Sequence, residues 1–256
     1  MLHEHITEDR SPHIAFDGRP APRALTSRRA FLRCVRTVST LAALPGLTVA
    51  CGSDAATGPV NGIPASGGPL LIDFAQGDAA FLQFALVLEQ LEAEFYTRVV
   101  DAFGTSNIGA AEQAVLTDIR NHEIAHRQYL QSALSATTAQ TVTPTFSGIN
   151  FADRATVLAA AKGLEDLGVA AYNGVVQYLT GPANVLAVAK IVSVEARHAA
   201  TIRDLLSAAT TDFSPNAEDD VYRPALVAAT VQANLVDKLG FLNAPSTFVQ
   251  GPRDNG

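Results

Sequence analysis

Two Glu-x-x-His motifs are the residues of this chain whose types and spacing could do chemistry. Glu123 and His126 lie in "NHEIAHRQYL", and Glu195 and His198 lie in "EARHAATIRDLL". Residues three apart on a helix leave the same face, so each motif presents a carboxylate beside an imidazole. One such motif is usually a solvated helix surface. Two of them at matching positions predict a shared site, and carboxylate with imidazole suits transition-metal ions.

A second repeated pattern precedes each motif. "LEQLEAEFYTRVV" and "LEDLGVAAYNGVV" share Leu-Glu-x-Leu and a tyrosine seven residues after the glutamate. The shared residues are Glu89, Glu165, Tyr96 and Tyr172. The chain therefore has the pattern of a duplicated pair of helices.

Four long helices would have to position these residues. Apolar residues recur with helical spacing over about 78–103, 110–136, 153–179 and 183–208. Asp78 and Asp153 are suitable N-caps, and Pro182 suits the start of a helix. We therefore predict an all-α four-helix bundle, with a shorter helix over about 224–242 packed outside it.

On a helical wheel, each of the four helices turns one carboxylate toward the bundle axis. Burying four uncompensated carboxylates would be costly, so we expect a cationic partner among them. One Glu from each of two helices plus Glu-x-x-His from each of the other two is the arrangement of dinuclear iron and manganese carboxylate sites. Four carboxylates would also neutralise two divalent ions.

At these motifs the sequence resembles the ferritin-like superfamily. The "LEQLEAEFY" and "LEDLGVAAY" stretches look like its desiccation-related, ferritin-like-domain branch, and the resemblance covers about residues 70–210. It implies a ferritin-like bundle that binds two iron ions, with manganese as the alternative. The metal ligands that it implies are Glu89, Glu123, His126, Glu165, Glu195 and His198.

Four nearby residues have roles that stay open. Glu92 is an alternative or additional ligand, because its counterpart in the third helix is Gly168, which would leave it room. Glu89 is preferred because the repeat supports it. We expect His122 to lie beside the metals rather than to bind them. The two repeated tyrosines are expected chiefly as core aromatics, with a role next to the metals as the alternative.

An export signal precedes the bundle. "SRRAFL", which contains Arg28 and Arg29, and the apolar run up to Ala50 resemble a bacterial twin-arginine signal peptide. A basic amphipathic helix is the alternative, and the run is too short to span a bilayer. The resemblance implies export by the twin-arginine machinery to the periplasm or cell envelope.

"LTVAC" then resembles a lipobox, in which Cys51 would carry a lipid that anchors the protein to the membrane. Thr48 stands where leucine is usual, so simple cleavage and release stays open. The predicted domains are a signal peptide over 1–50, a flexible linker over 51–70, the bundle over 71–210 and a C-terminal extension with a short helix over 211–256.

Charge excludes one class of partner. The chain has 18 basic and 25 acidic residues, and its first 50 residues hold seven arginines and four acids, so the remainder is strongly acidic. We therefore expect no nucleic-acid binding.

Two functions stay open: a dinuclear oxidoreductase of the ferroxidase or peroxidase kind that protects the envelope, and a metal-free or structural-metal stress protein without catalytic activity. Assembly into a homo-oligomer also stays open.

Overall fold

The fold is described by a computed structural model that covers residues 69–134 and 139–249. The predicted signal peptide with Arg28 and Arg29, the lipobox cysteine Cys51 and nearly all of the predicted linker lie outside the described residues. None of the helices in the described ranges is long and apolar enough to cross a membrane.

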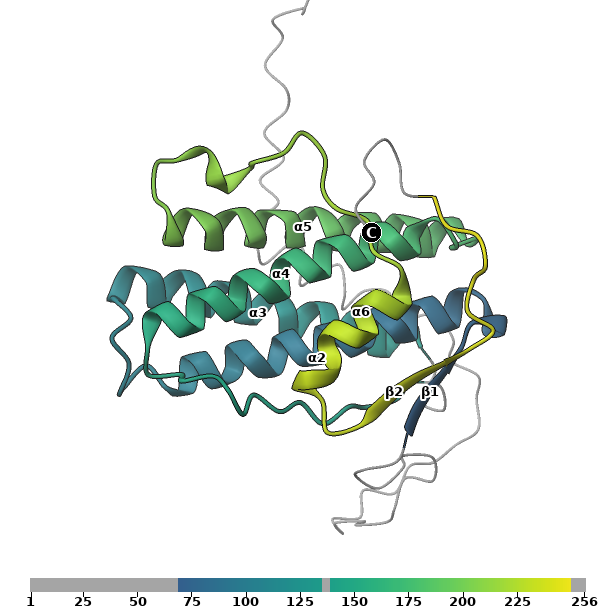
Figure 1. The fold of residues 1–256 in the computed structure, drawn as a ribbon, viewed down its shortest axis with the longest axis horizontal. Coiled ribbons are helices and arrows are strands. Elements are labelled where there is room, and N and C mark those ends of the chain that lie inside the picture. Colours follow the sequence, from purple (N-terminus) through teal and green to yellow (C-terminus); the bar gives the residue numbers. More distant parts are fainter. Residues whose placement is uncertain (1–68, 135–138, 250–256) are drawn as a thin grey trace, which may run out of the picture. The chain divides into compact units, whose positions relative to one another are not determined.

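Four long helices form a bundle, which confirms the predicted fold class (Figure 1). They are α2 (Asp78–Asp101), α3 (Ala110–Ala133), α4 (Arg154–Val176) and α5 (Pro182–Leu206). α2 packs chiefly against α3, and α4 packs chiefly against α5. The bundle is thus built from two helix pairs, in agreement with the repeat in the sequence.

The helix starts follow from local side chains. Asp153 is the N-cap of α4 and accepts a hydrogen bond from the amide of Thr156, while Pro182 is the first residue of α5. Asp78 is the first residue of α2 rather than its N-cap. Its carboxylate accepts hydrogen bonds from the α4–α5 turn over residues 180–184. Asp78 therefore ties the start of α2 to the opposite helix pair.

The core surrounds α2, where every residue from Ala80 to Ala93 is buried. The connection from α3 to α4 contributes to this cover, because the buried side chains of Gln83 and Gln90 hydrogen-bond its backbone at Gln140. By contrast, α3 buries only four residues, which are Leu116, Ile119, Glu123 and Leu130. The outer face of α3 is therefore exposed, whereas α2 has no exposed face between Ala80 and Ala93.

The C-terminal extension differs from its prediction. The short helix α6 spans Pro224–Val231, and its predicted continuation to residue 242 is wrong. The chain instead forms the 3-10 helix η3 (Gln232–Asn234) and the strand β2 (Lys238–Leu242). β2 pairs in parallel with β1 (Pro69–Asp73), so the end of the predicted linker belongs to a strand. Two further 3-10 helices are η1 (Phe74–Gln76) and η2 (Thr211–Phe213).

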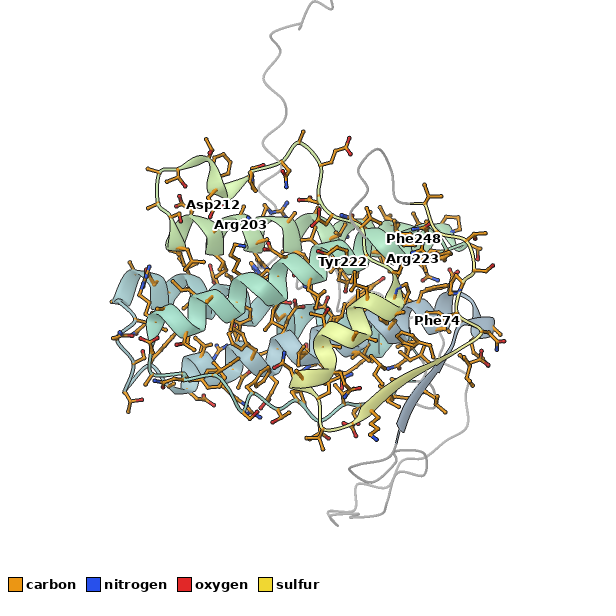
Figure 2. The ribbon with its side chains drawn as sticks, viewed as in Figure 1. Phe74, Arg203, Asp212, Tyr222, Arg223 and Phe248 are labelled. Carbon is orange, nitrogen blue, oxygen red and sulfur yellow. The ribbon has the colours of Figure 1, made fainter. Side chains whose placement is uncertain are left out.

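Tyr222 fixes the segment between α5 and α6 to α4 (Figure 2). Its amide donates a hydrogen bond of 2.9 Å to the carbonyl oxygen of Ala170. One turn further along α4, a Cβ placed on Gly174 would lie 2.0 Å from the carbonyl oxygen of Tyr222. Only glycine allows the two backbones to approach this closely.

Candidate metal centre

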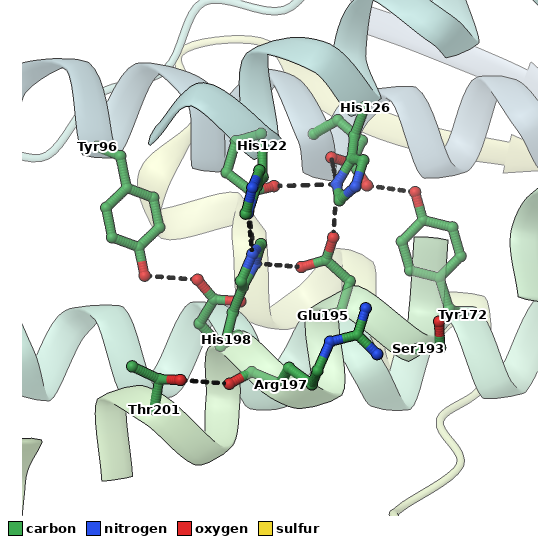
Figure 3. Close-up of polar contacts among 12 residues, drawn as sticks. Tyr96, His122, His126, Tyr172, Ser193, Glu195, Arg197, His198 and Thr201 are labelled. Atoms are coloured by element: carbon green, nitrogen blue, oxygen red, sulfur yellow. Dashed lines mark hydrogen bonds and ion pairs between the residues drawn. The ribbon is translucent and has the colours of Figure 1, made fainter. Parts of the chain in front are cut away.

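The six ligands implied by the sequence resemblance meet inside the bundle, and Figure 3 labels His126, Glu195 and His198 among them. Their donor atoms form two overlapping groups, within each of which all lie within 4.8 Å of one another. The first group is Glu89, Glu123, His126 and Glu195, and the second is Glu123, Glu165, Glu195 and His198. Glu123 and Glu195 belong to both groups. All four glutamates are completely buried.

Each histidine faces carboxylates with its Nδ1 atom. His126 Nδ1 lies 2.7 Å from Glu195 Oε1 and 3.4 Å from Glu89 Oε2. His198 Nδ1 lies 2.8 Å from Glu123 Oε1 and 3.5 Å from Glu165 Oε2. Each imidazole also lies 3.5–3.6 Å from the shared glutamate of its own helix, so it is next to both shared glutamates and to the one unshared glutamate of its group.

The donor atoms of this cluster lack ordinary hydrogen-bond partners. In the described ranges, nine buried side-chain atoms make no hydrogen bond of proper geometry, and eight of these belong to the six residues of the two groups. The histidine nitrogens lie at ion-pair distance from the glutamate oxygens, but the geometry of these contacts is not that of a hydrogen bond. Buried polar atoms are normally paired. A cation placed among these atoms would satisfy them, so the cluster could bind a metal.

The pKa values of the glutamates and histidines in the cluster also indicate that the buried carboxylates require positive charge. Burial raises the pKa of Glu89 well above its usual value, and the charge on Glu195 raises it further. Burial also raises the pKa of Glu165, to about 8. Burial alone would lower the pKa of His198, but close contacts with Glu123 and Glu165 outweigh it and raise that pKa to about 12. Protons therefore supply the positive charge in the metal-free cluster, and metal ions would displace them.

Two tyrosines hold the glutamates that are not shared. Tyr96 of α2 donates a hydrogen bond of 2.5 Å to Glu165 of α4. Tyr172 of α4 donates the equivalent hydrogen bond to Glu89 of α2. Both tyrosines are buried, as expected of core aromatics, and both also contact the cluster directly. The sequence signal for this contact was the tyrosine repeated seven residues after each glutamate.

Glu92 lies outside both groups of donor atoms. It is buried, and a Cβ on Gly168 would lie 3.0 Å from its Oε1, so Glu92 occupies the room that the missing side chain leaves. Burial raises the pKa of Glu92 well above its usual value, and the cluster carboxylates add to this effect. The structure thus brings Glu89 into the cluster and leaves Glu92 beside it.

His122 contacts the cluster from the surface. This residue is exposed, yet its Nδ1 lies 3.0 Å from Nε2 of His198, and the two rings are nearly parallel with centroids 5.2 Å apart. Partial burial of the ring and the neighbouring His198 lower the pKa of His122. His122 therefore lies beside the candidate ligands, on the side of His198 that faces away from the carboxylates.

The fold and the cluster together define a four-helix bundle protein with a carboxylate and histidine site that could bind metal. The ferritin-like domain family matches residues 77–208, and the chain belongs to this family. A search of the curated proteins found no match. Among solved structures, a conserved hypothetical protein from Mycobacterium tuberculosis is similar, with 17% sequence identity and a TM-score of 0.45. That similarity covers 53% of this chain and 94% of the other.

Proposed function

We propose that this protein is an exported member of the desiccation-related branch whose bundle holds two iron or manganese ions. With them it oxidises Fe(II) with O₂ or peroxide as the electron acceptor and so protects the cell envelope. The observation that carries the proposal is the convergence of eight unpaired buried donor atoms from six side chains. Four carboxylates would balance the charge of two divalent ions, which agrees with a dinuclear site rather than a single ion.

The six candidate ligands differ in whether they would bind one ion or both. Glu123 and Glu195 lie between the two positions and would bind both ions, whereas each of the other four ligands serves one position. Bound iron or manganese would supply the electrons for the redox reaction. The buried glutamates keep bulk water away from the ions. The His126 side chain is 13% exposed and that of His198 is 6% exposed, so the edge between α3 and α5 is the side of the cluster nearest to solvent.

The metal content of natively exported protein tests this function. We expect about two iron or manganese ions per chain, and we expect added Fe(II) to be oxidised with the appearance of near-ultraviolet Fe(III) absorbance. The matched control is the double variant Glu123→Gln/Glu195→Gln, which removes both shared carboxylates and should lose the ions and the activity together. Bound metal without any oxidation of Fe(II) or turnover of peroxide would favour the structural-metal stress protein. Absence of metal from the wild-type protein would favour the metal-free alternative.

The proposal of export rests on Arg28 and Arg29 in "SRRAFL". Two paired guanidinium groups are the recognised element of a twin-arginine signal. Replacing both arginines by lysine keeps the charge, and we expect the precursor to remain in the cytoplasm. Efficient export of this variant would contradict the twin-arginine proposal without affecting the metal site.

The proposal of a membrane anchor rests on Cys51 in "LTVAC". If Cys51 carries the lipid, Cys51→Ala should move the protein from the membrane fraction to the soluble fraction. Cys34→Ala is the matched control, because this cysteine lies within the predicted signal peptide and should leave the distribution unchanged. A soluble wild-type protein would instead support simple cleavage near Ala50.

A further inference from the structure

The two halves of the cluster are related by an approximate twofold symmetry. His126 Nδ1 lies 2.7 Å from Glu195, and His198 Nδ1 lies 2.8 Å from Glu123. Each residue of α3 in these pairs has its counterpart in α5 at a number higher by 72, as positions 123 and 195 and positions 126 and 198 show. The symmetry makes the two candidate metal positions equivalent in their carboxylates and imidazoles.

His122 breaks this symmetry. Its Nδ1 lies 3.0 Å from Nε2 of His198, and a dashed line joins the two rings in Figure 3. The position equivalent to His122 in the other half is 194, where the chain has a valine. Val194 has no side-chain group that could accept a hydrogen bond. In the described ranges, no hydrogen bond reaches Nε2 of His126. Among the residues that the structure describes, only the imidazole of His198 therefore has a hydrogen-bond partner for its outer nitrogen.

The direction of this hydrogen bond follows from the geometry of His198. Its Nδ1 faces the carboxylates, so a metal ion among them would be bound through Nδ1. The ring, neutral when it binds metal, must then carry its proton on Nε2, which donates to Nδ1 of His122. A hydrogen bond to the outer nitrogen of a metal-bound imidazole fixes the ring and makes its inner nitrogen a better ligand.

We propose that His122 is a positioning residue that makes the two metal positions unequal, so that the ion bound by His198 is held more tightly than the ion bound by His126. This inference rests on the proposed dinuclear site and adds an order to it. The His198 position fills first and empties last, and the His126 position is the exchangeable one. The greater exposure of His126, 13% against 6% for His198, agrees with this order.

Single-site proteins give the direct test, with Co(II) binding measured by calorimetry. His126→Gln leaves the His198 position intact, and His198→Gln leaves the His126 position intact. Adding His122→Val to the first protein should weaken Co(II) binding about 10–100-fold, the usual cost of losing such a partner. Adding His122→Val to the His198→Gln protein should change its Co(II) affinity by less than about twofold, because His122 supports the His198 position and not the His126 position that this protein keeps.

Two further variants separate hydrogen bonding from general structural effects. His122→Asn keeps an acceptor near the position of Nδ1 and should restore most of the affinity in the His126→Gln protein. In the intact site, His122→Val should bring the first and second Co(II) binding constants closer together, and Val194→His should tighten the weaker ion. Equal losses in both single-site proteins, or an unchanged spacing of the two constants in the intact site, would overturn the inference while leaving the dinuclear site standing. Wild-type protein that binds no Co(II), iron or manganese would overturn the proposed function and this inference with it.

Discussion

Tyr172 of α4 donates a hydrogen bond to Glu89 of α2, so a candidate ligand from one helix pair is held by the other pair. Tyr96 and Glu165 form the same contact in the opposite direction. These two contacts cross the interface between the halves of the bundle. They make the geometry of the cluster depend on how the halves dock.

Removing either phenol should therefore weaken both the bundle and the site. Tyr172→Phe leaves a buried carboxylate oxygen without its donor, at a cost of about 1.5–3 kcal/mol for a hydrogen bond to a charged group. In a domain of this size we expect the Tm of the metal-loaded protein to fall by about 4–10 °C. We also expect weaker binding of one ion, measured by metal titration. Tyr129→Phe is the control, because Tyr129 is 49% exposed and lies outside the cluster contacts. Equal effects of the two changes would contradict this role.

Shared and unshared ligands should differ in what their loss removes. His126→Ala and His198→Ala each remove a ligand of one position, so each variant should keep about one metal ion per chain. Glu123→Ala and Glu195→Ala each remove a ligand of both positions, so these variants should bind least metal. Elemental analysis of all four proteins beside wild type gives the stoichiometries. Full metal content in both histidine variants would contradict the ligand assignment.

Gly174→Ala should detach the segment that contains Tyr222. The added Cβ would meet the Tyr222 carbonyl oxygen at 2.0 Å, and relief requires a backbone shift that costs about 1–3 kcal/mol. We expect faster proteolysis within residues 211–249 and faster hydrogen exchange at the Tyr222 amide. Gly163→Ala in the same helix is the matched control. A Cβ there meets nothing within 4 Å, so alanine should stabilise α4 by about 0.5–1 kcal/mol.

The contribution of Asp78 should depend on pH. Burial alone would raise the pKa of Asp78, but hydrogen bonds from Asn184, Thr180 and Gly181 outweigh it and lower the pKa from 3.8 to about 2. The charged form is thus favoured in the folded state. The stabilisation is complete above pH about 4 and is lost as the pH falls toward 2.

Asp78→Asn tests this dependence by urea unfolding at several pH values. We expect the variant to be about 1–2 kcal/mol less stable than wild type at pH 6. The difference should shrink steadily between pH about 4 and 2, where Asp78 in the wild type becomes protonated. Asp101→Asn, at the exposed end of α2, controls for the simple loss of a charge. A difference that stays constant with pH would mean that the charge on Asp78 is not what stabilises the turn.

The sequence by itself determined the bundle and predicted which six side chains meet inside it. Four segments with helical spacing predicted α2, α3, α4 and α5 to within a few residues, because each helix buries a continuous apolar face. The repeated Glu-x-x-His motif, with a repeated glutamate before it, predicted the six residues that the structure brings together. These features are local, or are repeated copies of local features, and so can be seen in one chain.

Tertiary structure alone decided which glutamate of α2 joins the cluster. α2 is buried on all sides between Ala80 and Ala93, so a helical wheel cannot rank Glu89 against Glu92. The packing of α4 against α2 decides between the two glutamates. Tyr172 of α4 donates a hydrogen bond to Glu89, and the missing side chain of Gly168 leaves room for Glu92 outside the group of donor atoms. The pairing of His122 with His198 likewise depends on how α5 lies against α3.

Local sequence pattern also failed to predict the structure of the C-terminal segment after α6. An apolar stretch after Pro224 has a helical pattern, yet β2 forms because β1 supplies backbone hydrogen-bond partners from the other end of the domain. Pro69 pairs with Lys238 in this parallel ladder, although the two residues lie far apart in the sequence. Such pairing is set by where the bundle places the two segments, which no spacing within either segment records.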